Sequence, residues 1–139
     1  MSDPAAPLDF AQLVNAVERL LEGVERHRRE PHDEQLRDGL IQRFEFTYEL
    51  SHQMLRRYLR MVAPSPDEFD RMPFQELIRV GNEQGLLRCY WPVWRRYRKM
   101  QARTSHTYAA AVAAQVAAGI PDFLGEALFL RDQQRQRLG

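Results

Sequence analysis

The chain has 139 residues, of which 44% are hydrophobic and 28% charged, and its formal net charge is +1. These values are typical of one folded domain over residues 1–139 and exclude a disordered chain. A single cysteine, Cys89, excludes an intrachain disulfide and a thiolate metal site. Residues 1–7 lack the pattern of a signal peptide, and no apolar run suggests a membrane span, so we expect a cytoplasmic protein with no membrane partner.

Two long amphipathic helices are predicted in the first half of the chain. Apolar residues over 8–24, beginning with Leu8, recur at helical spacing, and Pro31 predicts that this helix ends near Glu30. The same spacing over 36–62 predicts a second helix of about thirty residues, or roughly 45 Å. Asp33 is the expected N-cap of this second helix.

The middle of the chain predicts a loop and two shorter helices. Residues 63–72 contain two prolines and three acidic residues, which is typical of a loop. Pro73 suits the first position of a short helix that ends at Gly81 or Gly85. Pro92 suits the start of a further helix.

Two more helical stretches are predicted before the C-terminus. An alanine-rich helix over 109–118 is expected to end at Gly119 and Pro121, and a last helix over 123–129 to fray into the polar tail 131–139. No strand pattern is found. The predicted fold class is therefore all-α, an antiparallel up-and-down bundle of four main helices with short extra helices. A further hypothesis is that this bundle buries one face against a second copy.

The charge is distributed unevenly. Residues 84–121 contain no Asp or Glu but six cations, so the other 14 basic and 19 acidic residues carry a net charge of −5. The six cations are Arg88, Arg95, Arg96, Arg98, Lys99 and Arg103. Such a local field attracts phosphates or an acidic protein surface, although a solvated helix face is the plainer reading. Aromatic and imidazole groups lie among the cations, which suits the stacking of a base beside its phosphate: Trp91, Trp94, Tyr97, His106 and Tyr108.

His106 is the candidate catalytic group. If the helix continues to His106, then Lys99, Arg103 and His106 share one face. Two cations would lower the pKa of the imidazole, so that neutral His106 could act as a general base on a ribose hydroxyl while Arg103 stabilises phosphate charge. The alternative is that His106 only caps a helix end. No two histidines have the spacing of metal ligands, so we predict no metal site and no cofactor.

Two acidic residues and the other histidines are expected to have structural roles. Glu45 and Glu49 are expected to face the basic helix and to pair with Arg98 or Arg103. The remaining histidines are expected at the surface or in packing contacts: His27, His32 and His52. No Gly-rich phosphate loop, GxSxG or HExxH motif is found, so the enzyme classes that use them are not predicted.

Three blocks together resemble the HEPN superfamily, and in particular its nucleotidyltransferase substrate-binding subunits. They are IQRFEFTYEL at 41–50, YRKM at 97–100 and SHTY at 105–108. The resemblance extends from the first helix to about residue 124. It implies an all-helical bundle, usually a homodimer, that forms a complex with a minimal nucleotidyltransferase encoded beside it.

Members of this superfamily commonly carry an Arg, four further residues, a His, any residue and a Tyr. In toxin-like members the Arg and His form a ribonuclease site across the dimer cleft, and the nucleotidyltransferase adenylylates the Tyr. The resemblance assigns these roles to His106 and Tyr108, but Gln101 stands where the Arg is expected. Glutamine supplies no charge to a phosphate, and Arg98 or Arg103 would have to compensate.

Three functions remain open at this point. The first is a partner subunit of a nucleotidyltransferase that binds nucleotide or phosphate, with Tyr108 as the modified residue. Its expected binding residues are Arg98, Lys99, Gln101, Arg103, Ser105 and His106, supported by Glu45, Tyr48 and Glu49. The second is a variant ribonuclease toxin acting on RNA through His106 and Arg103, neutralised by adenylylation of Tyr108. The third is a helical interaction module without nucleotide chemistry.

Overall fold

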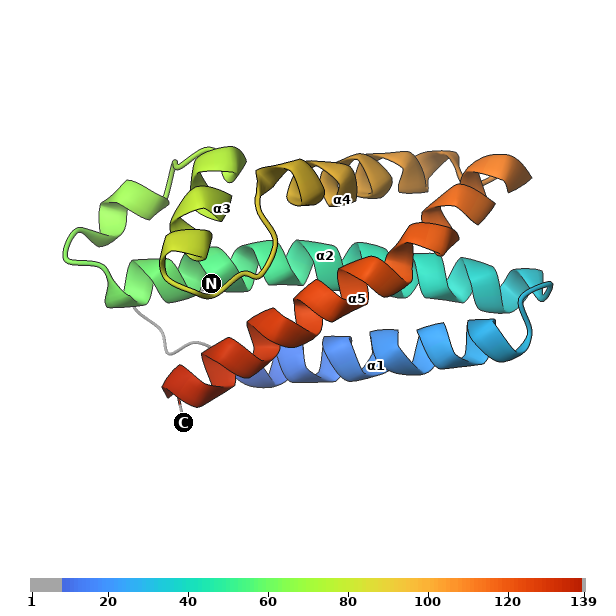
Figure 1. Cartoon of the computed structure of the whole chain (residues 1–139), viewed down its shortest axis with the longest axis horizontal. Helices are drawn as coiled ribbons and strands as arrows, with labels where there is room; N and C mark the ends of the chain where they lie inside the picture. The colour runs from blue at the N-terminus through green and yellow to red at the C-terminus, as the bar shows by residue number, and fades with distance from the viewer. Residues whose placement is uncertain (1–8, 139) are drawn as a thin grey trace.

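Four main helices run up and down in an antiparallel bundle in the computed structural model, which describes residues 9–138 (Figure 1). The helices are α1 (Phe10–Arg29), α2 (Glu34–Val62), α3 (Phe74–Glu83), α4 (Trp91–Arg103) and α5 (Ala110–Leu138), with short 3-10 helices η1 (Pro66–Phe69) and η2 (Thr104–His106). The main helices are α1, α2, α4 and α5, which confirms the predicted all-α class. The predictions on residues 1–7, Leu8 and Gly139 lie outside the described residues.

The α1–α2 hairpin follows the predicted boundaries. The helix α1 ends at Arg29 with Glu30 as its C-cap, because Pro31 restricts the residue before it. The carboxylate of Asp33 accepts a hydrogen bond from the Leu36 amide at 3.0 Å, which confirms Asp33 as the N-cap of α2. With 29 residues, α2 is as long as predicted and lies at the centre of the bundle (Figure 1).

The prediction that Gly119 and Pro121 end a helix is wrong, because α5 runs through both residues to Leu138. Pro121 is exposed, while apolar residues before and after it are buried, so packing on both sides holds the helix together. The polar tail is also helical. Gln134 is fully buried, and its amide donates to the Met54 carbonyl at 3.3 Å, which fixes the end of α5 against α2.

By length and composition alone, α5 is long and apolar enough to cross a bilayer, contrary to the prediction that no run qualifies. Core helices of bundles pass the same test. In this chain α5 packs against α1, α2 and α4, and it buries residues from Ala113 to Gln134. The helix therefore has the contacts of a core element.

The boundaries of α3 agree only in part with the prediction. Pro73 is its N-cap and not its first residue. Gly81 does not end the helix but lies inside it, where a Cβ would meet Leu87 at 2.9 Å. The turn after Glu83 is made by Gly85, whose φ of +72° is the left-handed conformation that glycine adopts most easily. Thus the second predicted terminator is correct and the first is wrong.

Aromatic rings fill the space between α2, α4 and α5. The ring of Phe123 makes edge contacts with Phe44, Tyr97 and Trp94 at centroid distances of 5.1, 5.2 and 6.1 Å. Trp94 and Tyr97 are at most 1% exposed, so the prediction that they stack on a base is wrong. Trp94 and Tyr97 are three residues apart, so both lie on the inner face of α4, and the cations of α4 lie on its solvent-facing side.

Candidate functional site

A buried carboxylate positions the start of α4. Glu126 on α5 is fully buried and accepts hydrogen bonds from the Arg88 amide at 2.9 Å, the Cys89 amide at 2.6 Å and the Trp94 indole at 3.0 Å. These three donors come from the loop before α4 and from its first turn. Glu126 was not predicted as a structural residue, although an acidic residue on the apolar face of the last predicted helix indicates a buried carboxylate with hydrogen-bond partners.

Further along, α4 is joined to α5 through Asp122. The Tyr97 hydroxyl donates to the Asp122 carboxylate at 2.8 Å, and the Arg96 guanidinium lies 2.9 Å from it. Burial and the hydrogen bond to Asp122 raise the pKa of Tyr97. The pair Arg96–Asp122 therefore takes one cation of the acid-free segment into the α4–α5 contact.

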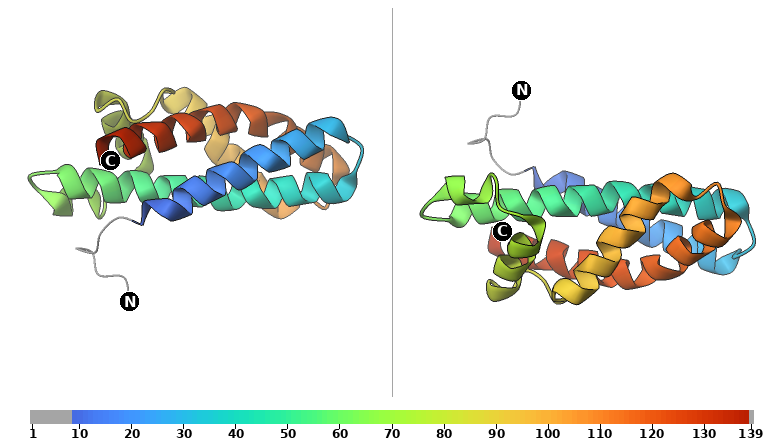
Figure 2. Two further views of the ribbon diagram at one scale, coloured as in Figure 1. Left: turned by 90° about the horizontal axis from the view of Figure 1, so that it is seen from below. Right: turned by 90° about the horizontal axis from the view of Figure 1, so that it is seen from above.

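Of the other five cations, Arg88 precedes α4, and four form an exposed surface, here called the basic α4 surface: Arg95, Arg98, Lys99 and Arg103. Figure 2 shows α4 on the outside of the bundle, over α2 and α5. Among the described residues, Arg95, Arg98 and Lys99 have no carboxylate within ion-pair distance, while Arg103 donates to the Gln115 side chain on α5. Unpaired surface cations of this kind attract phosphates and acidic surfaces.

The α-helical conformation stops at Arg103 and is followed by η2. Hydroxyl groups bond back to carbonyls three residues earlier, Thr104 to Gln101 at 2.7 Å and Ser105 to Ala102 at 3.3 Å. Such bonds compete with the helical pattern. The condition for Lys99, Arg103 and His106 to share one face, an α-helix that continues to His106, is therefore not met. Gln101 is half-buried, and Ser105 is exposed.

His106 and Tyr108 lie together at this end of the bundle. Their ring centroids are 6.3 Å apart with an interplanar angle of 69°, and both residues are exposed, Tyr108 to 87%. The Tyr108 hydroxyl has no hydrogen-bond partner within residues 9–138. The predicted imidazole–phenol pair is thus open to an approaching molecule on one side of the protein.

The three supporting residues on α2 behave differently from one another. Tyr48 is buried, and burial raises the pKa of its phenol to about 12 even though Arg98 acts in the opposite direction. Glu45 and Glu49 are exposed, and in the described part of the chain neither forms an ion pair with Arg98 or Arg103. The expected pairing is wrong because Arg103 turns to α5.

His52 is a packing residue, as expected, but its contacts on α2 and α3 were not predicted. Its ring lies 4.3 Å from that of Phe74, and its Nε2 lies 3.2 Å from an Arg56 nitrogen. Since a guanidinium only donates, this Nε2 accepts and the imidazole is neutral. Burial, followed by the charges of Arg56 and Arg98, lowers the pKa of His52 to about 4. The His52–Arg56 spacing of one turn was visible in the sequence.

Comparisons with known proteins agree with the fold. A family described as "Nucleotidyltransferase substrate binding protein like" matches residues 8–136. The chain belongs to this family. A Haemophilus influenzae relative described as "Probable ribonuclease HepT" is 42% identical over 99 residues, which cover 71% of this chain and 67% of the relative.

A solved structure is also similar to this chain. It is a Haemophilus influenzae protein described as having the fold of a substrate binding domain of a nucleotidyltransferase. It superimposes with a TM-score of 0.84 at 34% identity and covers 91% of this chain and 99% of its own. The match therefore covers most of the helical bundle of this family member.

Two residues of α2 have the spacing of metal ligands. Glu49 and His52 lie one turn apart on α2, a spacing that metal sites in helical bundles use. Within residues 9–138, however, no group of three or more His, Cys, Asp or Glu side chains is close enough together to hold an ion. The geometry offers polar and cationic contacts to a ligand rather than metal ligands.

Proposed function

We propose that this chain is the partner subunit of a minimal nucleotidyltransferase, that two copies form a homodimer, and that the basic α4 surface receives the enzyme together with its nucleotide. The family supports the association with a nucleotidyltransferase. The homodimer follows from the resemblance, and sedimentation showing a strict monomer at micromolar concentration would contradict it.

One observation carries this proposal: an exposed phenol beside an exposed imidazole, at the end of an acid-free surface. Tyr108 is 87% exposed and 6.3 Å from His106 between ring centroids. A tyrosine this exposed contributes little to folding, whereas an enzyme can reach it easily. The nearby cations Lys99 and Arg103 would offset the charge of an incoming triphosphate.

The chemistry expected at Tyr108 is nucleotidyl transfer. The phenolic oxygen attacks the α-phosphorus of a nucleoside triphosphate, the bond from that phosphorus to the bridging oxygen breaks, and pyrophosphate leaves. The phenolic proton passes to a base, for which His106 is the nearest imidazole in this chain. The product is a phosphodiester on Tyr108.

Charge reversal tests whether the basic α4 surface binds the enzyme. We expect the triple change Arg95→Glu, Arg98→Glu and Arg103→Glu to weaken binding of the adjacent nucleotidyltransferase at least about tenfold in calorimetry. The control reverses three exposed arginines elsewhere, Arg57, Arg71 and Arg135, with the same change in net charge. Equal weakening by both variants would contradict a specific surface.

A ribonuclease is the second candidate, because the relative at 42% identity is described as a probable ribonuclease and His106 is exposed. The charge missing at Gln101 is not replaced in the monomer. Arg103 is bonded to Gln115, and the Arg98 guanidinium lies over the Phe74 ring at 5.9 Å. We therefore expect weak or no RNA cleavage by the unmodified chain.

Restoring the arginine tests this second function. We expect Gln101→Arg to raise RNA cleavage at least about tenfold, because a cation then faces the phosphate in the transition state. Adding His106→Ala should abolish the gain. Cleavage by the natural chain that survives His106→Ala would instead point to a contaminating nuclease, and no gain from Gln101→Arg would argue against a disarmed ribonuclease.

A further inference from the structure

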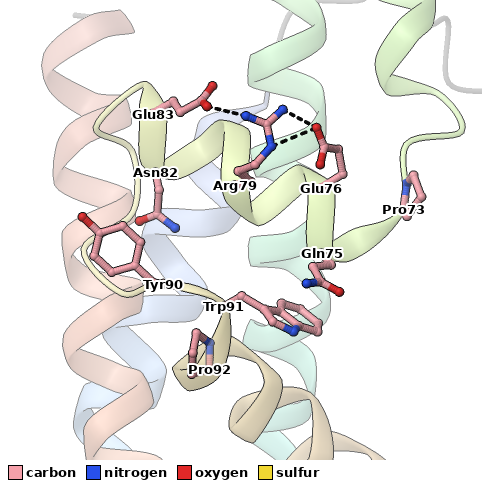
Figure 3. Close-up of a pocket in the computed structure, with 9 residues that line it drawn as sticks. All are labelled: Pro73, Gln75, Glu76, Arg79, Asn82, Glu83, Tyr90, Trp91 and Pro92. Atoms are coloured by element: carbon pink, nitrogen blue, oxygen red, sulfur yellow. Dashed lines mark hydrogen bonds and ion pairs between the residues drawn. The ribbon is translucent and has the colours of Figure 1, made fainter.

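A pocket of about 670 Å³ opens between α3 and the first turn of α4 (Figure 3). This volume lies within the range of small-molecule sites. Figure 3 shows Gln75 and Trp91 on one side of the pocket and Asn82 and Tyr90 on the other. None of these four residues belongs to the imidazole–phenol pair, so the pocket is a separate feature of the surface.

The pocket presents flat apolar surfaces. Trp91 is half-buried, and Phe74 holds its indole at a centroid distance of 5.9 Å and an angle of 72°. Tyr90, on the facing side, is 71% exposed. A fixed indole opposite an accessible phenol suits the stacking of a planar heterocycle, and such stacking tolerates any base.

Amide groups at the same place can read the edge of a ring. The Asn82 amide nitrogen donates to the Ile78 carbonyl at 3.0 Å, which leaves its carbonyl oxygen as an acceptor. Gln75 is exposed and makes no hydrogen bond among the described residues. Asn and Gln side chains match the donor and acceptor groups of adenine.

The rim of the pocket does not suit a phosphate. The guanidinium of Arg79 is ion-paired with both Glu76 and Glu83 (Figure 3), so the rim carries two carboxylates and one cation that is already engaged. An anionic group would therefore avoid this side of the pocket. A ligand with both a base and a phosphate would direct the phosphate towards α4.

Cations follow Trp91 on the same face of α4. Arg95 and Arg98 are four and seven residues beyond Trp91, which places them one and two turns along that face. The Arg98 guanidinium lies 5.9 Å from the centroid of Phe74, the ring on which Trp91 packs.

We propose that this junction binds a nucleotide, with its base between Trp91 and Tyr90 and its phosphate on Arg95 and Arg98. This nucleotide is separate from the nucleoside triphosphate that Tyr108 is proposed to attack, so the inference goes beyond the proposed function. It assigns the base to the pocket at the first turn of α4, whereas the phenol follows η2 at the other end of α4.

Calorimetry on the purified chain tests the site with three probes: AMP, inorganic pyrophosphate and adenosine. We expect AMP to bind more tightly than either of the others, because only AMP can use both halves of the site. Arg95→Gln with Arg98→Gln should weaken AMP and pyrophosphate about tenfold or more. The matched control Arg96→Gln removes a cation on the opposite edge of α4 and should leave both affinities unchanged.

The base pocket is tested separately. Trp91→Leu should weaken AMP at least about fivefold and leave pyrophosphate unchanged. Gln75→Ala removes a side chain that is proposed to bind the edge of the base, so it should also weaken AMP binding. Because Gln75 is exposed, this change should not affect folding. If neither variant affects AMP, or if Arg96→Gln weakens it as much as the double variant, the inference is wrong. The inference would also be wrong if a short RNA binds more tightly than AMP and its affinity is unchanged by Trp91→Leu.

The failure of this site can be told apart from failure of the proposed function. Tyr108→Phe should bind AMP as the natural chain does, and Trp91→Leu should still form the complex with the nucleotidyltransferase. Loss of AMP binding in Tyr108→Phe would place the nucleotide at the imidazole–phenol pair and contradict the inference.

Discussion

Glu126 is the residue on which the placement of α4 depends most. Its buried carboxylate satisfies two backbone amides and the Trp94 indole. We expect Glu126→Ala to lower the free energy of unfolding by about 2–4 kcal/mol, because three buried donors lose their acceptor. Urea denaturation measures this loss. Glu126→Gln keeps one oxygen acceptor and should cost less, and equal losses in the two variants would contradict the role given to the hydrogen bonds.

His52 should make stability depend on pH. A histidine in an unfolded chain has a pKa near 6.5, whereas that of folded His52 is about 4. Between these values the unfolded chain binds more protons, so the free energy of unfolding falls as the pH is lowered. Because His52 is partly solvated, we expect a contribution on the order of 1 kcal/mol between pH 7 and pH 5.

Comparison of variants isolates this contribution. His52→Gln should lose less stability than the natural chain between pH 7 and pH 5, as measured by urea denaturation at constant ionic strength. His32→Gln changes an exposed histidine between α1 and α2 and is the matched control. A His52→Gln variant with the same pH dependence as the natural chain would show that His52 is not the cause.

At the scale of the helices, α5 continues through a proline because its packing holds it together. The nitrogen of Pro121 cannot donate to the carbonyl of Ala117, and a proline inside a helix is unfavourable by about 3 kcal/mol. We expect Pro121→Ala to raise the free energy of unfolding by about 1–3 kcal/mol in urea denaturation. A loss of stability would instead mean that the bundle needs the local shape that Pro121 gives to α5.

Helix positions were predictable where local chemistry sets them. The Asp33 cap, the end before Pro31 and the turn at Gly85 follow from side-chain hydrogen bonds and backbone preferences within a few residues. Pro121 misled the prediction because burial on both of its sides outweighs the local penalty. The prediction for Trp94 was wrong because aromatic residues at helical spacing can pack in a core as well as contact a ligand.

At the scale of the whole molecule, the sequence predicted the all-α class and the four-helix bundle but not which faces meet. The acid-free segment was visible in the sequence. Its division into Arg96 on Asp122, Arg103 on Gln115 and Arg98 over Phe74 depends on contacts between distant helices. The contact of His52 with Phe74 was not predicted for the same reason, because it joins two helices.

The central claim is that the exposed end of the bundle offers Tyr108 to a nucleotidyltransferase. The direct measurement is the intact mass of the chain after incubation with ATP and its proposed nucleotidyltransferase partner. Tyr90, which is 71% exposed, provides the matched control. We predict a nucleotidyl adduct on the natural chain and on Tyr90→Phe, and none on Tyr108→Phe. An adduct that persists on Tyr108→Phe, or none on the natural chain, would contradict the claim.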